Sequence, residues 1–134
     1  MTNGSSRSGS PDEVRVLFVE DDPMVAEMYR LKLELDGYQV TMAKDGEDGL
    51  ELASRLEPDI IFLDIRLPKV GGLEVLEQLR STNATRNTPV VILSNYGERE
   101  LVERGLKLGA LEYLIKSQTT PARLSGGVER WLKE

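Results

Sequence analysis

Five chemically active side chains stand at the ends of short apolar runs in the sequence: Glu20, Asp21, Asp64, Ser94 and Lys116. Carboxylates gathered in one place repel each other unless something positive lies among them. Oxygen ligands, in the absence of imidazole or thiol groups, favour Mg²⁺, a hard cation held by few carboxylates and water. A carboxylate beside Mg²⁺, a hydroxyl and a lysine suit a phosphoryl group. An aspartate there would be the nucleophile and form an acyl phosphate, while the metal and the ammonium group offset charge on the equatorial oxygens.

The composition narrows the chemistry available to the chain. Its 134 residues include no histidine and no cysteine, which excludes a Ser-His-Asp triad, a histidine base, a thiol nucleophile, a cysteine zinc site and disulfides. The length predicts a single domain. The net charge is −6 without a basic run, so we expect no direct binding of nucleic acid. Because no apolar run approaches the ~18 residues of a membrane span and no signal peptide is visible, we expect no membrane partner and a cytoplasmic location.

Short apolar runs alternate with helical patterns from residue 14 onward. The runs cover residues 14–19, 38–43, 60–63, 90–93 and 111–115. This alternation predicts an α/β fold, a doubly wound five-stranded parallel sheet with five helices. The solid runs 60–63 and 90–93 are typical of central strands, and the alternating run 38–43 is typical of an edge. The functional crevice of such a sheet lies beyond the carboxyl ends of its strands, where the five side chains stand.

Capping residues indicate where the first helices begin and end. Asp22 and Pro23 suit the start of the first helix, Gly37 ends it, and Asp45 suits the start of the second. Residues 1–13 are rich in Gly and Ser and predict a flexible tail. Four apolar residues share one face of the first helix by their spacing: Met24, Met28, Leu31 and Leu35.

Five stretches, in order and at matching spacing, resemble the receiver domain of bacterial two-component response regulators. They are VLFVEDD, the Gly-terminated first helix, DIRLPKVGG, VILSN and GALEYLIK. The resemblance spans residues 14–133, so we interpret residues 14–134 as a receiver domain. It implies the flavodoxin-like strand order 2-1-3-4-5, with the first strand beside the third.

The resemblance implies a role for each residue of a phosphorylation site. Asp64 is similar to the phospho-accepting aspartate, and Lys116 is similar to the lysine that pairs with the phosphoryl group. Asp21 resembles the direct Mg²⁺ ligand, and Glu20 resembles the acid that holds the metal through water. Asp64 and the backbone carbonyl of Arg66 would complete the protein ligands.

The resemblance also implies a switch, and it implies which residues control the lifetime of the phosphorylated state. Ser94 is similar to the hydroxyl that turns toward the phosphoryl oxygen, and Tyr113 to the aromatic that swings inward when it does. The signal would reach a protein-binding face formed by the fourth helix, fifth strand and fifth helix. Arg66 and Tyr96 would flank the path of the hydrolytic water, which predicts a long-lived phosphorylated state.

Two positions depart from the pattern of the family. Gly71 stands where Asp or Asn is frequent. The usual Lys-Pro, with its cis peptide, is here Lys116-Ser117. A cis bond before a residue other than proline costs about 2.5–4 kcal/mol. Either this bond is cis at that cost, or the loop holds the lysine in another way.

The leading hypothesis is a signalling switch rather than an enzyme with an external substrate. Its phosphodonor would be a sensor histidine kinase or a phosphotransfer protein. Its downstream partner would be a protein. A second copy of this chain, with which it would form a homodimer on phosphorylation, is a further partner. The chain would be a stand-alone receiver or part of a larger regulator.

Two alternatives fit the sequence less well. A haloacid-dehalogenase-type phosphatase needs a second acid where Arg66 stands. A flavodoxin-like electron carrier needs a Ser/Thr/Gly-rich phosphate loop where this chain has acids.

Overall fold

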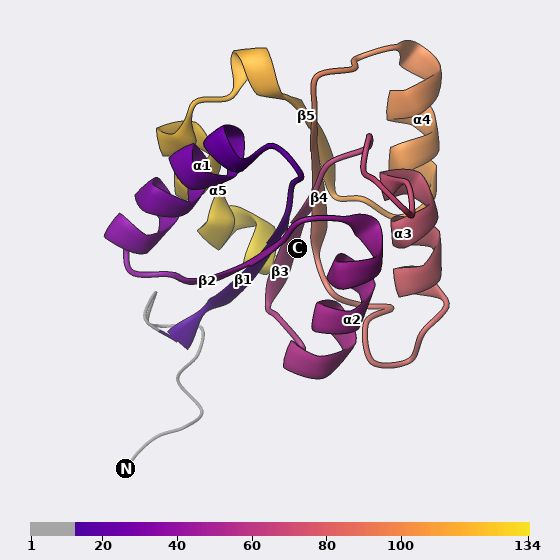
Figure 1. Ribbon diagram of the computed structural model, residues 1–134, viewed down its shortest axis with the longest axis horizontal. Coiled ribbons are helices and arrows are strands. Elements are labelled where there is room, and N and C mark those ends of the chain that lie inside the picture. The colour runs from indigo at the N-terminus through magenta and orange to yellow at the C-terminus, as the bar shows by residue number, and fades with distance from the viewer. Residues whose placement is uncertain (1–12) are drawn as a thin grey trace.

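The computed structural model describes residues 13–134 of the chain. They form one parallel sheet in the order β2-β1-β3-β4-β5, with helices on both faces (Figure 1). The strands are β1 (Arg15–Val19), β2 (Gln39–Ala43), β3 (Ile60–Leu63), β4 (Val90–Ser94) and β5 (Glu112–Ile115). The helices are α1 (Pro23–Leu35), α2 (Gly46–Leu56), α3 (Gly72–Arg80), α4 (Arg99–Lys107) and α5 (Pro121–Leu132), with a 3₁₀ turn η3 (Lys116–Gln118). The predicted fold class and strand order are confirmed. The predicted tail lies, apart from residue 13, outside the described residues.

Two layers of helices cover the sheet. Helices α1 and α5 lie on one face, while α2, α3 and α4 lie on the other (Figure 1). Strands β3 and β4 are buried along their whole length, as solid apolar runs predict. The edge strands β2 and β5 are partly exposed. Between residues 13 and 134, no helix has the length and apolar character needed to cross a membrane.

A row of four aromatic rings fills the space between the sheet and the α1–α5 layer. Phe18 of β1 lies at its centre, with the ring centroid of Tyr29 at 5.6 Å and that of Phe62 at 5.4 Å. Trp131 of α5 meets Phe62 edge-on at 5.8 Å. These are the separations at which aromatic pairs attract beyond their burial. The row therefore ties α1 and α5 to the two strands between them.

The capping residues act as the sequence predicts. The Asp22 side chain accepts a hydrogen bond from the backbone N–H of Met24, and Asp45 accepts one from the N–H of Asp48. Gly37 follows α1 with a φ of 99°, a left-handed conformation that favours glycine. The predicted starts of α1 and α2 and the end of α1 are confirmed.

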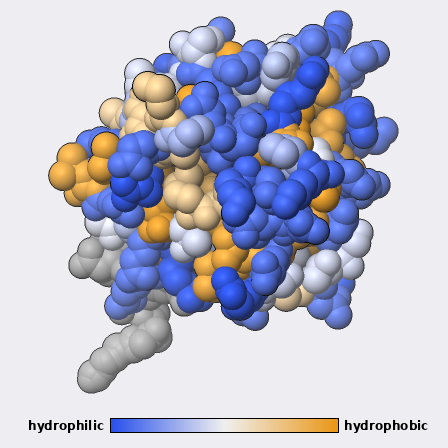
Figure 2. All heavy atoms as spheres, in the orientation of Figure 1, coloured by the Kyte–Doolittle hydropathy of each residue, from blue (hydrophilic) through white to orange (hydrophobic). Residues whose placement is uncertain are grey.

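The apolar face predicted for α1 points to solvent rather than to the sheet. Its four residues are between 46% and 83% exposed: Met24, Met28, Leu31 and Leu35. The helix packs instead through a second stripe, in which Tyr29 and Leu33 are buried. Periodicity alone could not choose between two apolar stripes on one helix. Apolar side chains at the surface over α1 are visible in Figure 2.

The orientation of α1 leads to a matched pair of stability measurements. We expect Leu33→Ala to lower the free energy of unfolding by about 2–5 kcal/mol, because it empties a fully buried site. We expect Leu31→Ala, on the exposed stripe, to change it by less than about 0.5 kcal/mol. Urea denaturation of both variants measures the difference. Equal losses would contradict the observed packing of α1.

Candidate functional site

Neighbouring strands end at the same level, which brings the predicted site residues together. Leu63 at the end of β3 is in register with Val19 of β1 on one side and with Ile92 of β4 on the other. The next residues along the first two strands, Glu20 and Asp64, therefore emerge side by side. The predicted gathering of polar groups at the carboxyl edge is present in the structure.

Three carboxylates meet at this edge. Glu20, Asp21 and Asp64 each present an oxygen within 4.8 Å of the others. Glu20 and Asp64 are 3% and 5% exposed, while Asp21 is open to solvent. Burial raises the pKa of Glu20 above its usual value, and the nearby charge of Asp64 adds to the effect. Arg66 follows Asp64 by two residues and its side chain is exposed; the metal-binding role of its carbonyl stays a prediction.

Lys116 supplies the opposite charge. Its Nζ lies 2.7 Å from Glu20 Oε1 and 2.9 Å from Asp64 Oδ2. Burial by itself lowers the pKa of Lys116, but its hydrogen bonds and ion pairs with the two carboxylates raise it above its usual value. The site thus holds three acids and one ammonium group, and negative charge is in excess.

The loop after β3 is shaped by a glycine that the sequence reasoning did not single out. Asp64 Oδ1 accepts a hydrogen bond from the backbone N–H of Ile65 at 2.7 Å, and the Gly72 N–H bonds to the Ile65 carbonyl at 2.7 Å. A Cβ at position 72 would lie 2.0 Å from the backbone oxygen of Asp64. Position 72 therefore has no room for a side chain. The adjacent pair Gly71-Gly72 was the available signal.

The two predicted switch residues contact the same loop. Ser94 is fully buried, and its Oγ accepts a hydrogen bond from the Tyr96 N–H at 3.0 Å. The hydroxyl of Tyr113 donates to the Tyr96 carbonyl. The ring of Tyr113 also faces Gly105 of α4, where an added Cβ would lie 3.3 Å from it. The loop after β4 is thus held between Ser94 and Tyr113.

The two residues predicted to control hydrolysis lie against each other. The guanidinium carbon of Arg66 is 4.3 Å from the centroid of the Tyr96 ring, a cation–π distance. Arg66 follows β3 and Tyr96 follows β4, so their contact bridges the loop that begins with Asp64 and the loop that follows Ser94.

Comparison with known proteins agrees with this geometry. The family model described as the response regulator receiver domain matches residues 16–126. The chain belongs to this family. The receiver domain is 40% identical over 102 residues to the "DNA-binding dual master transcriptional regulator RpaA" of Synechocystis, covering 76% of this chain and 42% of RpaA. The chain therefore spans less than half the length of this curated relative.

Solved receiver domains share the fold. The receiver domain of the Francisella response regulator 1452 superimposes with a TM-score of 0.82 at 34% identity, covering 90% of this chain and 97% of that one. The BeF3-activated N-terminal receiver domain of Klebsiella pneumoniae RstA gives a TM-score of 0.81 at 29% identity, covering 90% and 99%.

This receiver domain holds its lysine without a cis peptide. No peptide bond among the described residues is cis, and Lys116 instead begins the turn η3. The Thr119 N–H bonds to the Lys116 carbonyl at 3.2 Å, and the Thr119 hydroxyl bonds to the Ile115 carbonyl at 2.9 Å. Of the two arrangements that the sequence left open at Lys116-Ser117, the second is observed.

Proposed function

We propose that this receiver domain accepts a phosphoryl group on Asp64 with the help of Mg²⁺, and that the modification switches a protein-binding face formed by α4, β5 and α5. The observation that carries the proposal is the buried Asp64 carboxylate, which lies beside Glu20 and Asp21 and is paired with the ammonium group of Lys116. The chain acts on itself and turns over no external substrate. Its phosphodonor is a sensor histidine kinase or a phosphotransfer protein.

The donor set fits Mg²⁺. All the side-chain ligands are carboxylates, which hard cations prefer. Glu20 Oε1 is buried and has no aligned hydrogen bond among the described residues, although it is ion-paired with Lys116. Glu20, Asp21, Asp64 and the Arg66 carbonyl would hold the ion. When bound, Mg²⁺ neutralises negative charge on the phosphoryl oxygens.

The chain's own residues carry out the transfer of the phosphoryl group. One Asp64 oxygen attacks the phosphorus of the donor, and the bond from phosphorus to the donor nitrogen or oxygen breaks as the new one forms. The Lys116 ammonium group, 2.9 Å from Asp64 Oδ2, pairs with the charge that develops on the transferred group. The acyl phosphate carries about one more negative charge than the Asp64 carboxylate that it replaces, which the Lys116 ammonium group partly offsets. The hydroxyl of Ser94 gains a phosphoryl oxygen to which it can donate.

An exposed stripe next to the site supports a protein as the phosphodonor. The donor must reach the carboxyl edge of the sheet, where α1 begins directly after the acid pair. The apolar stripe of α1 runs away from this edge: Met24, Met28, Leu31 and Leu35. A continuous apolar face on a helix suits a partner helix packed against it.

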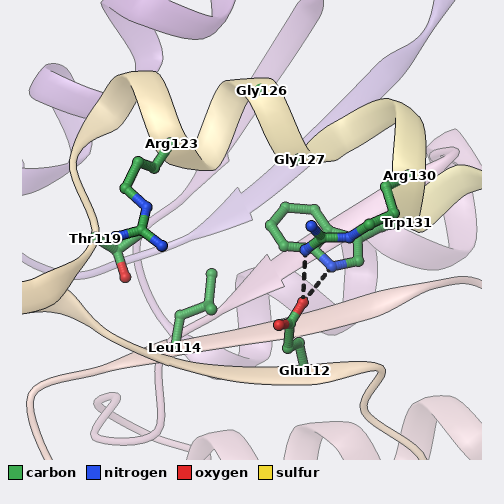
Figure 3. Close-up of a pocket in the computed structure, with 8 residues that line it drawn as sticks. All are labelled: Glu112, Leu114, Thr119, Arg123, Gly126, Gly127, Arg130 and Trp131. Atoms are coloured by element: carbon green, nitrogen blue, oxygen red, sulfur yellow. Dashed lines mark hydrogen bonds and ion pairs between the residues drawn. The ribbon is translucent and has the colours of Figure 1, made fainter.

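The output face contains a hollow that supports a protein as the downstream partner. A cavity of about 290 Å³ lies between β5 and α5 (Figure 3). Gly126 forms part of its wall, and Arg123 and Arg130 lie toward its two ends. Glu112 of β5 bonds to both Arg130 and Trp131 across it. A partner side chain that enters this hollow would sense any movement of β5 against α5.

The assignment of Asp64 is tested with acetyl phosphate and Mg²⁺. We expect one phosphoryl group to be added to the wild-type chain, because the carboxylate is the nucleophile, and none to Asp64→Asn or after chelation of Mg²⁺. Mass spectrometry measures the added group. Asp22→Asn, which keeps a capping side chain, is the matched control and should label as the wild type does. Labelling of Asp64→Asn at the wild-type rate would contradict the proposal, and sustained phosphate release would indicate a phosphatase.

The switch is tested by removing one hydroxyl. Ser94→Ala should still accept phosphate, since Asp64 and Lys116 are unchanged, but it should lose most of the response of α4 and β5. Hydrogen–deuterium exchange with and without acetyl phosphate measures that response. Ser117→Ala, an exposed serine in the next loop, is the control. An undiminished response in Ser94→Ala would count against the hydroxyl as the coupling group.

The lifetime of the phosphorylated state depends on the Arg66–Tyr96 pair. Hydrolysis needs a water in line with the bond to Asp64. Both side chains are large and neither orients a water as a base would, while the guanidinium can also bond to phosphoryl oxygens. Each effect slows hydrolysis by about tenfold, or ~1.4 kcal/mol.

The effect of removing the Arg66–Tyr96 pair should be measurable. We expect the double variant Arg66→Asn, Tyr96→Glu to lose phosphate at least about tenfold faster than the wild type. Decay of purified phosphorylated protein is followed directly. If the double variant decays no faster, the stacked pair does not set the lifetime.

A further inference from the structure

The position of Lys116 depends on a short loop anchored by Thr119. The lysine side chain has four rotatable bonds, so its ammonium group reaches the carboxylates reliably only if its backbone is fixed. Thr119 bonds to the Lys116 carbonyl through its N–H and to the Ile115 carbonyl through its hydroxyl. These bonds close the turn on itself. The pairing of Ile115 with Ser94 holds the start of the turn in the sheet, but the end at Thr119 lies beyond β5 and needs a further connection to the segment that carries the acids.

A contact from α1 provides that connection. The Tyr29 hydroxyl donates to the Thr119 carbonyl at 2.6 Å, across 90 positions of sequence. Tyr29 is 1% exposed, and its ring stacks on Phe18 with an interplanar angle of 24°. Phe18 stands two residues before Glu20 on the same chain segment. One side chain thus contacts both the strand that carries the metal-binding acids and the loop that carries the lysine.

Other features of Tyr29 agree with a fixed donor. Burial raises the pKa of Tyr29 above its usual value, so its hydroxyl keeps the proton that it donates. The acceptor is a backbone carbonyl of a buried residue, so another side chain at position 119 would preserve the contact.

We propose that Tyr29 is a positioning residue for phosphoryl transfer, which holds the Lys116 loop in place relative to the acids through the Thr119 carbonyl. This role rests on the proposed phosphorylation of Asp64. It gives the loop at Lys116-Ser117 an anchor that does not depend on the geometry of its own peptide bond.

The test compares Tyr29→Phe with Tyr38→Phe. Tyr29→Phe keeps the ring and its stack on Phe18 but removes the hydroxyl. Tyr38 is also buried in the α1–α5 layer, but it lies beyond the far end of α1, near Asp36 and Glu129. We expect Tyr29→Phe to be phosphorylated by acetyl phosphate about five- to tenfold more slowly, and Tyr38→Phe to react as the wild type does. Equal rates for wild type and Tyr29→Phe would overturn the proposal.

A double-mutant cycle separates positioning from general destabilisation. In a Lys116→Ala background there is no ammonium group to position, so adding Tyr29→Phe should slow the reaction no further. If Tyr29→Phe slows both backgrounds by the same factor, the hydroxyl acts on something other than the lysine and the proposal is wrong. If the wild type itself accepts no phosphate, the proposed function fails instead.

A spectroscopic readout needs no phosphorylation. The ¹³Cε cross-peak of Lys116, assigned by its loss in Lys116→Ala, should move in Tyr29→Phe and stay in place in Tyr38→Phe. It also reports the folded fraction of a destabilised variant, so the comparison holds if stability falls. An unmoved cross-peak in folded Tyr29→Phe would show that the lysine does not depend on the tyrosine.

Discussion

The arrangement of this domain depends on two buried carboxylates that share one ammonium group. Glu20 and Asp64 are almost fully buried, and Lys116 lies within 2.9 Å of both. Removing one partner from a buried ion pair leaves a charge without compensation, at a cost of about 3–5 kcal/mol. The fold must therefore deliver a lysine from the edge strand β5 to acids that end β1 and β3. The remaining excess of negative charge is what makes the site receptive to a cation and to the phosphoryl chemistry that a cation assists.

A parallel sheet meets that requirement because all its strands end at one edge. Register between β1, β3 and β4 sets the acids side by side, and the close approach of Gly72 to Asp64 keeps the loop after β3 tight. The loop after β4 is held through the Ser94 hydroxyl and the Tyr113 hydroxyl. A rotation of the Ser94 hydroxyl away from this position would break its bond to the Tyr96 N–H and so release the loop after β4.

The sequence was sufficient for features that depend on local chemistry. The strands, the caps at Asp22 and Asp45 and the gathering of acids at the carboxyl edge follow from short patterns with a physical cause. The prediction of which face of α1 is buried was wrong, because that helix carries two apolar stripes and only tertiary packing selects Tyr29 and Leu33. The contact of Tyr29 with a backbone carbonyl left no trace in the sequence, since any residue could supply that acceptor. The pair Gly71-Gly72 is visible in the sequence, but the need for glycine at position 72 became clear only from its close approach to the Asp64 backbone.

The aromatic row under the sheet has a practical consequence. Trp131 is the sole tryptophan of the chain, and its indole N–H is donated to Glu112 on β5. Its ring is buried and touches Phe62, two residues before Asp64. The emission of a single indole in this position depends on the local field and on its hydrogen bond. The domain thus carries an intrinsic optical reporter at the junction of the core with β5, and its state can be followed in solution without an attached dye.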